Sequence, residues 1–227
     1  MHLARGFLNP ISRDVTRDLS NPVELHRTLL RAFPDALGDA PRAKVGLLFR
    51  VDLGKDGGSL LVVQSRMAAD FSKLPAGYFL DSSDDRFFSL GWSRNPRVEV
   101  VDNERVAVGE RFAFRLRANV TKKIGTKTPL EGKATNGRRV PLRGDLERLA
   151  WLKRKAASAG FDILDGRVLE EESCSGKRGD AKVTLAGVRF DGLLSVVDPA
   201  IFRSALEAGI GPAKAYGFGL LSVVLVG

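Results

Sequence analysis

The sequence predicts an α+β protein made of two tandem ferredoxin-like domains, each with the RRM-like order β-α-β-β-α-β. The chain of 227 residues is 44% apolar, enough for one large domain or two small ones with real cores. Short apolar runs typical of strands alternate with capped helical segments. This order of elements occurs twice. We therefore expect domains at residues 1–105 and 106–227, joined near residues 102–110.

The first domain is expected to open with a short apolar strand at His2–Leu8, followed by a loop that leads to the first helix. A helix should start after Asn21, because Asn is a good N-cap, Pro22 suits the first helical position and Glu24 suits the third. Pro34 should end this helix near residue 33. The remaining elements are two strands joined by a hairpin turn, a weak helical stretch and a last strand, at Val45–Val51, Ser59–Ser65, residues 67–95 and Val98–Val101.

The second domain is expected to open with a two-faced strand at Arg111–Val120. Phe112, Phe114 and Leu116 alternate there with basic residues, so one face should be apolar and the other strongly basic. The later elements are a helix, two strands, a helix capped by Asp198 and a final buried strand, at Asp145–Ser158, Phe161–Leu169, Val183–Val197, residues 199–208 and Leu220–Val226.

Positive charge is concentrated in the second half of the chain. The formal net charge is +9, yet residues 111–155 hold 14 Lys and Arg against three acidic residues, a net charge of +11. Several of these cations lie in a Gly- and Thr-containing loop rather than on one amphipathic helix, which favours a nucleic-acid backbone over a membrane surface. An ordinary solvated face is the alternative.

Cysteine and histidine are too scarce for two common kinds of site. The single Cys174 excludes an internal disulfide framework, and with two histidines there is no zinc ligand set at a usual spacing. We expect no metal and no cofactor. The N-terminus shows no basic leader with a long apolar run, and no segment approaches the length of a membrane span, so we expect a soluble, cytoplasmic protein without membrane contact.

The most unusual local sequence is the glycine-rich loop formed by Gly209, Gly211, Gly217 and Gly219. It fails the dinucleotide-binding pattern, because Lys214 stands where a third glycine is needed and a helix rather than a strand precedes it. Two interpretations remain open. The backbone can approach a ligand closely, with Lys214 adding a cation, or the loop is a flexible helix-to-strand connection.

His26 is the candidate for acid–base chemistry. It lies one turn into the first predicted helix, and a helical wheel places it in the apolar arc with Val23, Leu29 and Phe33. A histidine in that position is usually packed in the core. The residues alone therefore leave two readings, a core histidine or a catalytic one.

Several segments together resemble the CasE family, the CRISPR repeat-RNA endoribonucleases of the type I-E Cascade complex. The glycine loop and the strand that follows it are the most specific part of the resemblance. The matching segments are Asn21–Leu29, Arg115–Asn119, Arg139–Leu142, Ala150–Leu152, Gly209–Lys214 and Gly217–Ser222.

The resemblance implies a nuclease that binds the stem-loop of a CRISPR repeat, cuts at its 3′ side without metal and stays on the mature guide RNA as a Cascade subunit. His26 is then the catalytic imidazole. Some relatives carry a tyrosine three residues earlier, where this chain has Val23, so either His26 works mostly alone or another group such as Lys177, Lys182 or Tyr216 assists. Attack by the 2′-hydroxyl would leave a 2′,3′-cyclic phosphate and a 5′-hydroxyl.

RNA binding is assigned to the basic residues of the second half, some of them in a hairpin that enters the stem in relatives. The expected partners are the repeat hairpin and other Cascade subunits, with the free protein monomeric. The alternative is a structured-RNA-binding subunit without activity. The predicted RNA-binding residues are Arg115, Arg117, Lys122, Lys123, Arg138, Arg139, Lys177, Arg178, Lys182 and Lys214.

Overall fold

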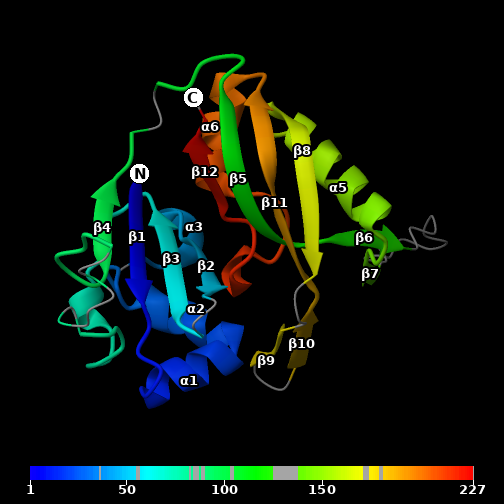
Figure 1. Cartoon of the computed structure of the whole chain (residues 1–227). Helices are drawn as coiled ribbons and strands as arrows, with labels where there is room; N and C mark the ends of the chain where they lie inside the picture. The colour runs from blue at the N-terminus through cyan, green and yellow to red at the C-terminus, as the bar shows by residue number, and fades with distance from the viewer. Residues whose placement is uncertain are drawn as a thin grey trace.

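The computed structural model describes most of the chain. The described residues are 1–226 except 36, 55–56, 82, 84–86, 88–89, 103–104, 125–137, 171–173 and 179–180. Figure 1 shows two antiparallel sheets side by side, one from each half of the sequence. The α+β prediction is confirmed at this level.

The first half forms a four-stranded sheet in the order β2-β3-β1-β4. All its neighbouring strands are antiparallel, and their bounds are β1 His2–Phe7, β2 Leu48–Leu53, β3 Ser59–Ser65 and β4 Arg97–Val100. The helical elements of this half are α1 Arg13–Ser20, α2 Pro22–Leu30, α3 Pro41–Val45 and the 3₁₀ turn η1 Phe71–Lys73.

The second half forms a sheet in the order β12-β5-β11-β8, also antiparallel throughout. Its strands are β5 Arg111–Asn119, β8 Phe161–Glu170, β11 Gly187–Val196 and β12 Leu221–Leu225, and its helical elements are α5 Asp145–Ala157, α6 Pro199–Ala208 and η2 Lys214–Tyr216. Two hairpins leave this sheet, β6 Thr121–Ile124 with β7 Arg138–Pro141, and β9 Cys174–Arg178 with β10 Ala181–Leu185.

Three local predictions were wrong. Residues 13–20 form α1 rather than a loop, and the predicted strand Val45–Val51 starts late because α3 occupies its first position. The predicted strand Val183–Val197 is two strands. Gly187 pairs with Asn119, the last residue of β5, so the chain before Gly187 has no β5 partner and instead forms the hairpin with β9.

Each half has its own apolar core, and a third cluster joins them. The alternating pattern of β5 is confirmed, because Phe112, Phe114 and Leu116 are buried in the second core. The third cluster contains Leu48 and Val62 of the first sheet and Leu220 of the second half, all nearly inaccessible to solvent. The halves are therefore packed together through apolar side chains.

A buried guanidinium reinforces this contact. Arg50 of β2 is 3% exposed and donates to both carboxylate oxygens of Asp52, to the carbonyl of Leu220 and to Ser222 Oγ. Asp52 also lies 3.6 Å from Arg115 of β5, which donates to Asp191 of β11 through two bonds of 3.0 Å. We call Arg50, Asp52, Arg115 and Asp191 the inter-sheet clasp.

The clasp leads to a stability prediction. Arg50→Met removes a buried cation and leaves Asp52 and the Leu220 carbonyl short of donors, so we expect a loss of about 3–5 kcal/mol in the free energy of unfolding. Arg97→Met is the matched control on the same sheet, because its ion pair with Glu99 is partly exposed and is worth about 0–1 kcal/mol. Urea unfolding measures both, and equal losses would contradict the account.

Candidate functional site

Helix α2 carries His26 and begins as predicted. The Asn21 side chain accepts a hydrogen bond from the Val23 amide at 3.1 Å, and Pro22 occupies the first turn. Leu25 and Leu29 are buried in the first core. The helix ends at Leu30, three residues before the predicted end, and the chain tightens there into turns.

His26 lies where α2, β2 and the glycine-rich loop meet. Its ring stacks on Phe49 of β2, with 6.3 Å between the ring centroids. The same Phe49 ring borders the glycine-rich loop, because a Cβ built on Gly217 would lie 3.2 Å from it. The side chain is partly buried. His26 is therefore not enclosed in the core of the first half but lies against an element of the second half.

The His26 imidazole has a nitrogen without a partner. Nε2 is buried, and no hydrogen bond reaches it from any residue that the structure describes. Most buried polar atoms are paired, and an exception asks for a functional explanation. Desolvation, with a smaller contribution from the positive charge of Arg42, lowers the pKa of His26 to about 4. The ring is therefore neutral at pH 7 and able to accept a proton.

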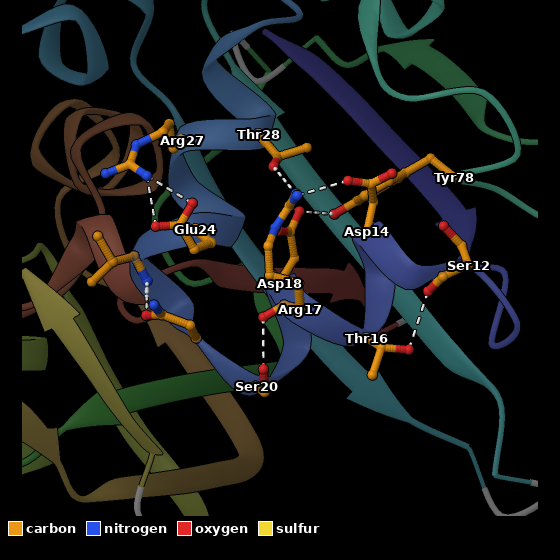
Figure 2. A network of polar contacts seen from close by, with 12 residues as sticks. Ser12, Asp14, Thr16, Arg17, Asp18, Ser20, Glu24, Arg27, Thr28 and Tyr78 are labelled. Carbon is orange, nitrogen blue, oxygen red and sulfur yellow. Dashed lines mark hydrogen bonds and ion pairs between the residues drawn. The ribbon is translucent and has the colours of Figure 1, made fainter.

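A polar network around the buried Asp18 side chain connects α2 to α1 (Figure 2). Asp18 of α1 is fully buried and accepts hydrogen bonds from the Tyr78 hydroxyl at 2.8 Å and from Arg17 at 2.9 Å. Arg17 also donates to Thr28 Oγ1 of α2 at 3.3 Å. Burial and the Asp18 charge raise the pKa of Tyr78, so its hydroxyl stays a donor. The network ties α1 and α2 together.

The glycine-rich loop is closely packed, so its interpretation as a flexible connection was wrong. Gly209 and Gly219 have positive φ angles, which favour glycine. A Cβ on Gly209 would lie 2.8 Å from Leu48, and one on Gly219 would lie 2.7 Å from the Ile210 carbonyl. The 3₁₀ turn η2 within the loop packs against α2. In this structure the loop backbone packs against protein, and its approach to a ligand stays a prediction.

Two cations near α2 come from different halves, Arg42 from the first and Lys214 from the second, and their charges influence each other. Burial and the nearby charges of Arg42 and Lys155 lower the pKa of Lys214 in η2. Burial and Arg66 lower the pKa of Arg42 in α3. Within the described part of the chain, neither Arg42 nor Lys214 forms an ion pair with a carboxylate. Arg42 was not among the predicted site residues, because α3 itself was not predicted.

The predicted RNA-binding residues of β5 face the first sheet. Arg115 belongs to the inter-sheet clasp, where two carboxylates match its charge and raise its pKa. Arg117 lies over the ring of Phe218, 4.8 Å from the centroid. These two arginines are therefore engaged between the sheets, and their contact with RNA stays a prediction.

The β6–β7 hairpin presents other predicted residues to solvent. Lys123 pairs in register with Arg139, and both are exposed. Lys122 forms an exposed ion pair with Glu147 at 3.1 Å. The side chain of Arg138 lies outside the described residues. This hairpin forms a basic surface on the far side of the second half (Figure 1).

The β9–β10 hairpin lies against the N-terminal end of α2. A Cβ on Gly176 would come within 2.3 Å of Asn21 Oδ1, so β9 passes very close to the helix cap. Lys177 and Lys182 occupy opposite positions in the hairpin, and Arg178 is opposite Ala181. The side chains of these three basic residues are outside the described part. The backbone nevertheless brings this hairpin to the helix that bears His26.

The fold and the site define an α+β protein of two joined sheets, in which the partly buried His26 imidazole has a nitrogen that is unpaired among the described residues and the cation Arg42 nearby. Among the described residues, no helix is long and apolar enough to cross a membrane.

A family model and two known proteins match this chain, and the first two of these matches cover nearly its whole length. A family model described as CRISPR associated protein matches residues 1–224. The CRISPR-associated endoribonuclease Cse3 of Thermus thermophilus is 33% identical, over 98% of this chain and 99% of its own. The Cascade subunit CasE of Escherichia coli is 37% identical over 52% of this chain and 60% of its own. The chain therefore belongs to this family of CRISPR-associated proteins and to its CasE group, as the resemblance implied.

Solved structures of relatives have the same fold. Cse3 bound to a 19-nucleotide RNA superimposes with a TM-score of 0.81 at 31% identity, covering 99% of this chain and all of that one. The CRISPR-associated protein Cas6e from Escherichia coli superimposes with a TM-score of 0.66 at 25% identity, with full coverage of both chains.

The site predicts a pH dependence. The pKa of His26 is about 4 in the folded protein and about 6.5 in the unfolded chain, so the unfolded chain binds more protons between these values. This contribution to stability is complete above pH 6.5 and is lost as the pH falls toward 4. An NMR titration of the His26 ring, assigned with His26→Ala, measures the pKa directly. A midpoint near 6.5 in the folded protein would contradict the described environment.

Proposed function

We propose that this protein is an endoribonuclease that binds the stem-loop of CRISPR repeat RNA and cleaves it at its 3′ side. The observation that carries the proposal is the match, over nearly the whole chain, to a relative named as an endoribonuclease. A second Cse3 structure, 32% identical with a TM-score of 0.76, is bound to an RNA representing a pre-cleavage complex. An imidazole among cations supports the same chemistry.

The two halves are interpreted as ferredoxin-like domains, at residues 1–105 and 106–227. In each sheet the first and third strands of the half are central, and the second and fourth are at the edges. Antiparallel sheets with this order fit a β-α-β-β-α-β unit. The two separate cores support the division, and the third cluster is then a domain interface.

In the proposed reaction the 2′-hydroxyl attacks the adjacent phosphorus. A neutral His26 suits the role of general base, taking the 2′-hydroxyl proton as the new P–O bond forms. The bond from phosphorus to the 5′-oxygen then breaks, and that oxygen takes up a proton. The products are a 2′,3′-cyclic phosphate and a 5′-hydroxyl, and no metal ion takes part.

A second group has to supply the proton to the leaving oxygen, and Val23 cannot. Lys177 and Lys182 are candidates, since the hairpin that carries them lies beside α2. Tyr216 is another, because η2 packs against the same helix. The choice among these three belongs to experiment.

RNA binding is assigned to the basic half. Lys122, Lys123, Arg138 and Arg139 would contact stem phosphates, since A-form stems are bound mainly through phosphates and shape. Lys177, Arg178 and Lys182 would contact the base of the stem, and Lys214 the cleavage site. Arg115 and Arg117 would contribute where the RNA crosses the edge of the inter-sheet contact.

After cleavage the enzyme would stay on its product as a subunit of Cascade. The support is a structure of a CRISPR RNA-guided surveillance complex, one chain of which superimposes with a TM-score of 0.67 at 25% identity. The alternative is a subunit that binds structured RNA without cutting it, which the missing tyrosine at Val23 favours.

The first test of this function uses labelled repeat hairpin in EDTA, beside the same RNA with a deoxyribose at the cut site. We expect cleavage of the first RNA only, and loss of that cleavage in His26→Ala with little change in affinity for the hairpin. The reason is that a positioned acid or base contributes about 10²–10⁴ in rate. Tight binding with no cleavage of either RNA would establish the binding subunit instead.

A second prediction concerns the β6–β7 hairpin. Reversing two charges with Arg138→Glu and Arg139→Glu should weaken hairpin RNA binding and flatten its salt dependence, because fewer counterions are released. Binding measured at several salt concentrations between about 50 and 200 mM gives the slope. Arg13→Glu with Arg97→Glu is a matched control in the first half. An unaltered slope in the 138/139 variant would assign the RNA to another surface.

A further inference from the structure

We propose that Arg42 binds the scissile phosphate of the RNA beside His26, together with Lys214 from the other half. This inference rests on the function proposed above and adds a substrate-contacting residue to the site. Arg42 lies in the short helix α3 of the first half, outside the basic region of the sequence.

Hydrogen bonds to the segment just before β2 fix the position of Arg42. Its Nη1 donates to the carbonyl of Leu47 at 3.3 Å, and the Leu47 amide donates back to the Arg42 carbonyl at 3.0 Å. Two residues later comes Phe49, whose ring stacks on His26. Arg66 holds the end of α3 by donating to the carbonyls of Ala43 and Lys44. The guanidinium is therefore tied to the strand that supports the imidazole.

The guanidinium of Arg42 has donors to spare. It carries five N–H groups, and the described structure uses Nη1 for a single carbonyl. The charge is partly buried, and it has no ion pair with a carboxylate in the portion of the chain that is described. A planar guanidinium in this state is suited to bidentate contact with a phosphate.

Lys214 reaches the same place from the second half. The close packing of Gly209 against Leu48 and of Gly219 against Ile210 and Lys214 holds η2 against α2. The charges of Arg42 and Lys214 repel each other, which is why Arg42 lowers the pKa of Lys214. Like charges held together without a counter-charge cost free energy, and an anion between them removes this cost. The arrangement is that of an anion site completed by ligand.

A phosphate bound here would also change His26. Among the charged groups on the elements around the ring, Glu24 pairs with Arg27 on α2, Arg50 with Asp52 on β2, and Arg17 with Asp14 and Asp18 on α1. Arg42 of α3 and Lys214 of η2 have no carboxylate partner in the described structure. The side chains of Lys177 and Arg178 on β9 lie beyond what is described. With Arg42 as the cation that lowers the His26 pKa, an RNA phosphate on Arg42 offsets that effect and stabilises the imidazolium formed when the ring takes the 2′-hydroxyl proton.

The test compares Arg42→Gln and Arg42→Lys with the control Arg13→Gln, which removes an exposed arginine of α1 from the same half. Single-turnover cleavage of the repeat hairpin gives the rate, and binding of the hairpin with a deoxyribose at the cut site gives the affinity. We expect Arg42→Gln to lower the cleavage rate about 10²–10³-fold, the effect typical of losing one hydrogen-bond donor to the transition state. The change in affinity for the hairpin should be much smaller. Arg42→Lys should recover part of the rate.

The pH profile separates this role from a structural one. Without Arg42, the pKa of His26 in the free protein should rise, so the acidic limb of the pH–rate profile should move to higher pH. A thermal melt of each variant checks folding, and Arg42→Lys keeps the charge if Arg42→Gln is unstable.

The outcomes are distinguishable. Cleavage by Arg42→Gln at the rate of the control, with an unmoved profile, would overturn the role of Arg42 and leave the proposed nuclease function intact. Absence of cleavage by the unaltered protein would overturn both.

Discussion

One buried contact, the guanidinium of Arg50 between the two sheets, joins the halves beside the apolar cluster of Leu48, Val62 and Leu220. This group binds Asp52 of its own strand and the Leu220 carbonyl and Ser222 of the other half. Its neighbours in sequence build the site. Phe49, one residue before Arg50, stacks on His26, and the glycine-rich loop ends immediately before Leu220. A site made from two halves thus keeps a fixed geometry, because the contact that joins them is only a few residues away on each side.

The charged groups of the clasp and those near His26 differ in how their charges are balanced. The charges of the clasp are matched, since Arg50 and Arg115 share Asp52 and Arg115 also binds Asp191. Arg42 and Lys214 instead lie close enough for their charges to repel each other, and Arg42 is also near the uncharged imidazole of His26. The first arrangement stabilises the free protein. The second is unfavourable until an anion binds, and it therefore belongs to the ligand-bound state, in which the backbone of an RNA supplies the missing negative charge.

Much of the fold could be read from local signals. The cap at Asn21 and the alternation of Arg111–Val120 predicted α2 and β5, because caps and periodicity are properties of neighbouring residues. Helix α1 was missed for the opposite reason. Its sequence is mostly polar, and it is held by burial of Asp18 against Tyr78, sixty residues away. Helix α3, five residues long between left-handed residues, depends equally on its surroundings.

The site residues also divide into those with a local sequence signal and those placed only by tertiary packing. The residues alone left His26 between a core and a catalytic interpretation. In the structure the side chain is partly buried, with Nε2 unpaired among the described residues, and its catalytic role stays a prediction. Arg42 has no sequence signal, since only the packing of α3 and η2 around α2 brings it to the imidazole. The functional role of Lys177 and Lys182 stays a prediction.

The most direct measurement of the central claim is the pKa of His26 in complex with repeat hairpin RNA that carries a deoxyribose at the cut site. An NMR titration of the ring in the free and bound protein gives both values. The account predicts a pKa of about 4 without RNA and a higher value with RNA bound, because the phosphate offsets the smaller contribution of Arg42 to the lowering while the contribution of burial remains. The same pKa in both states would mean that the scissile phosphate does not lie at this site.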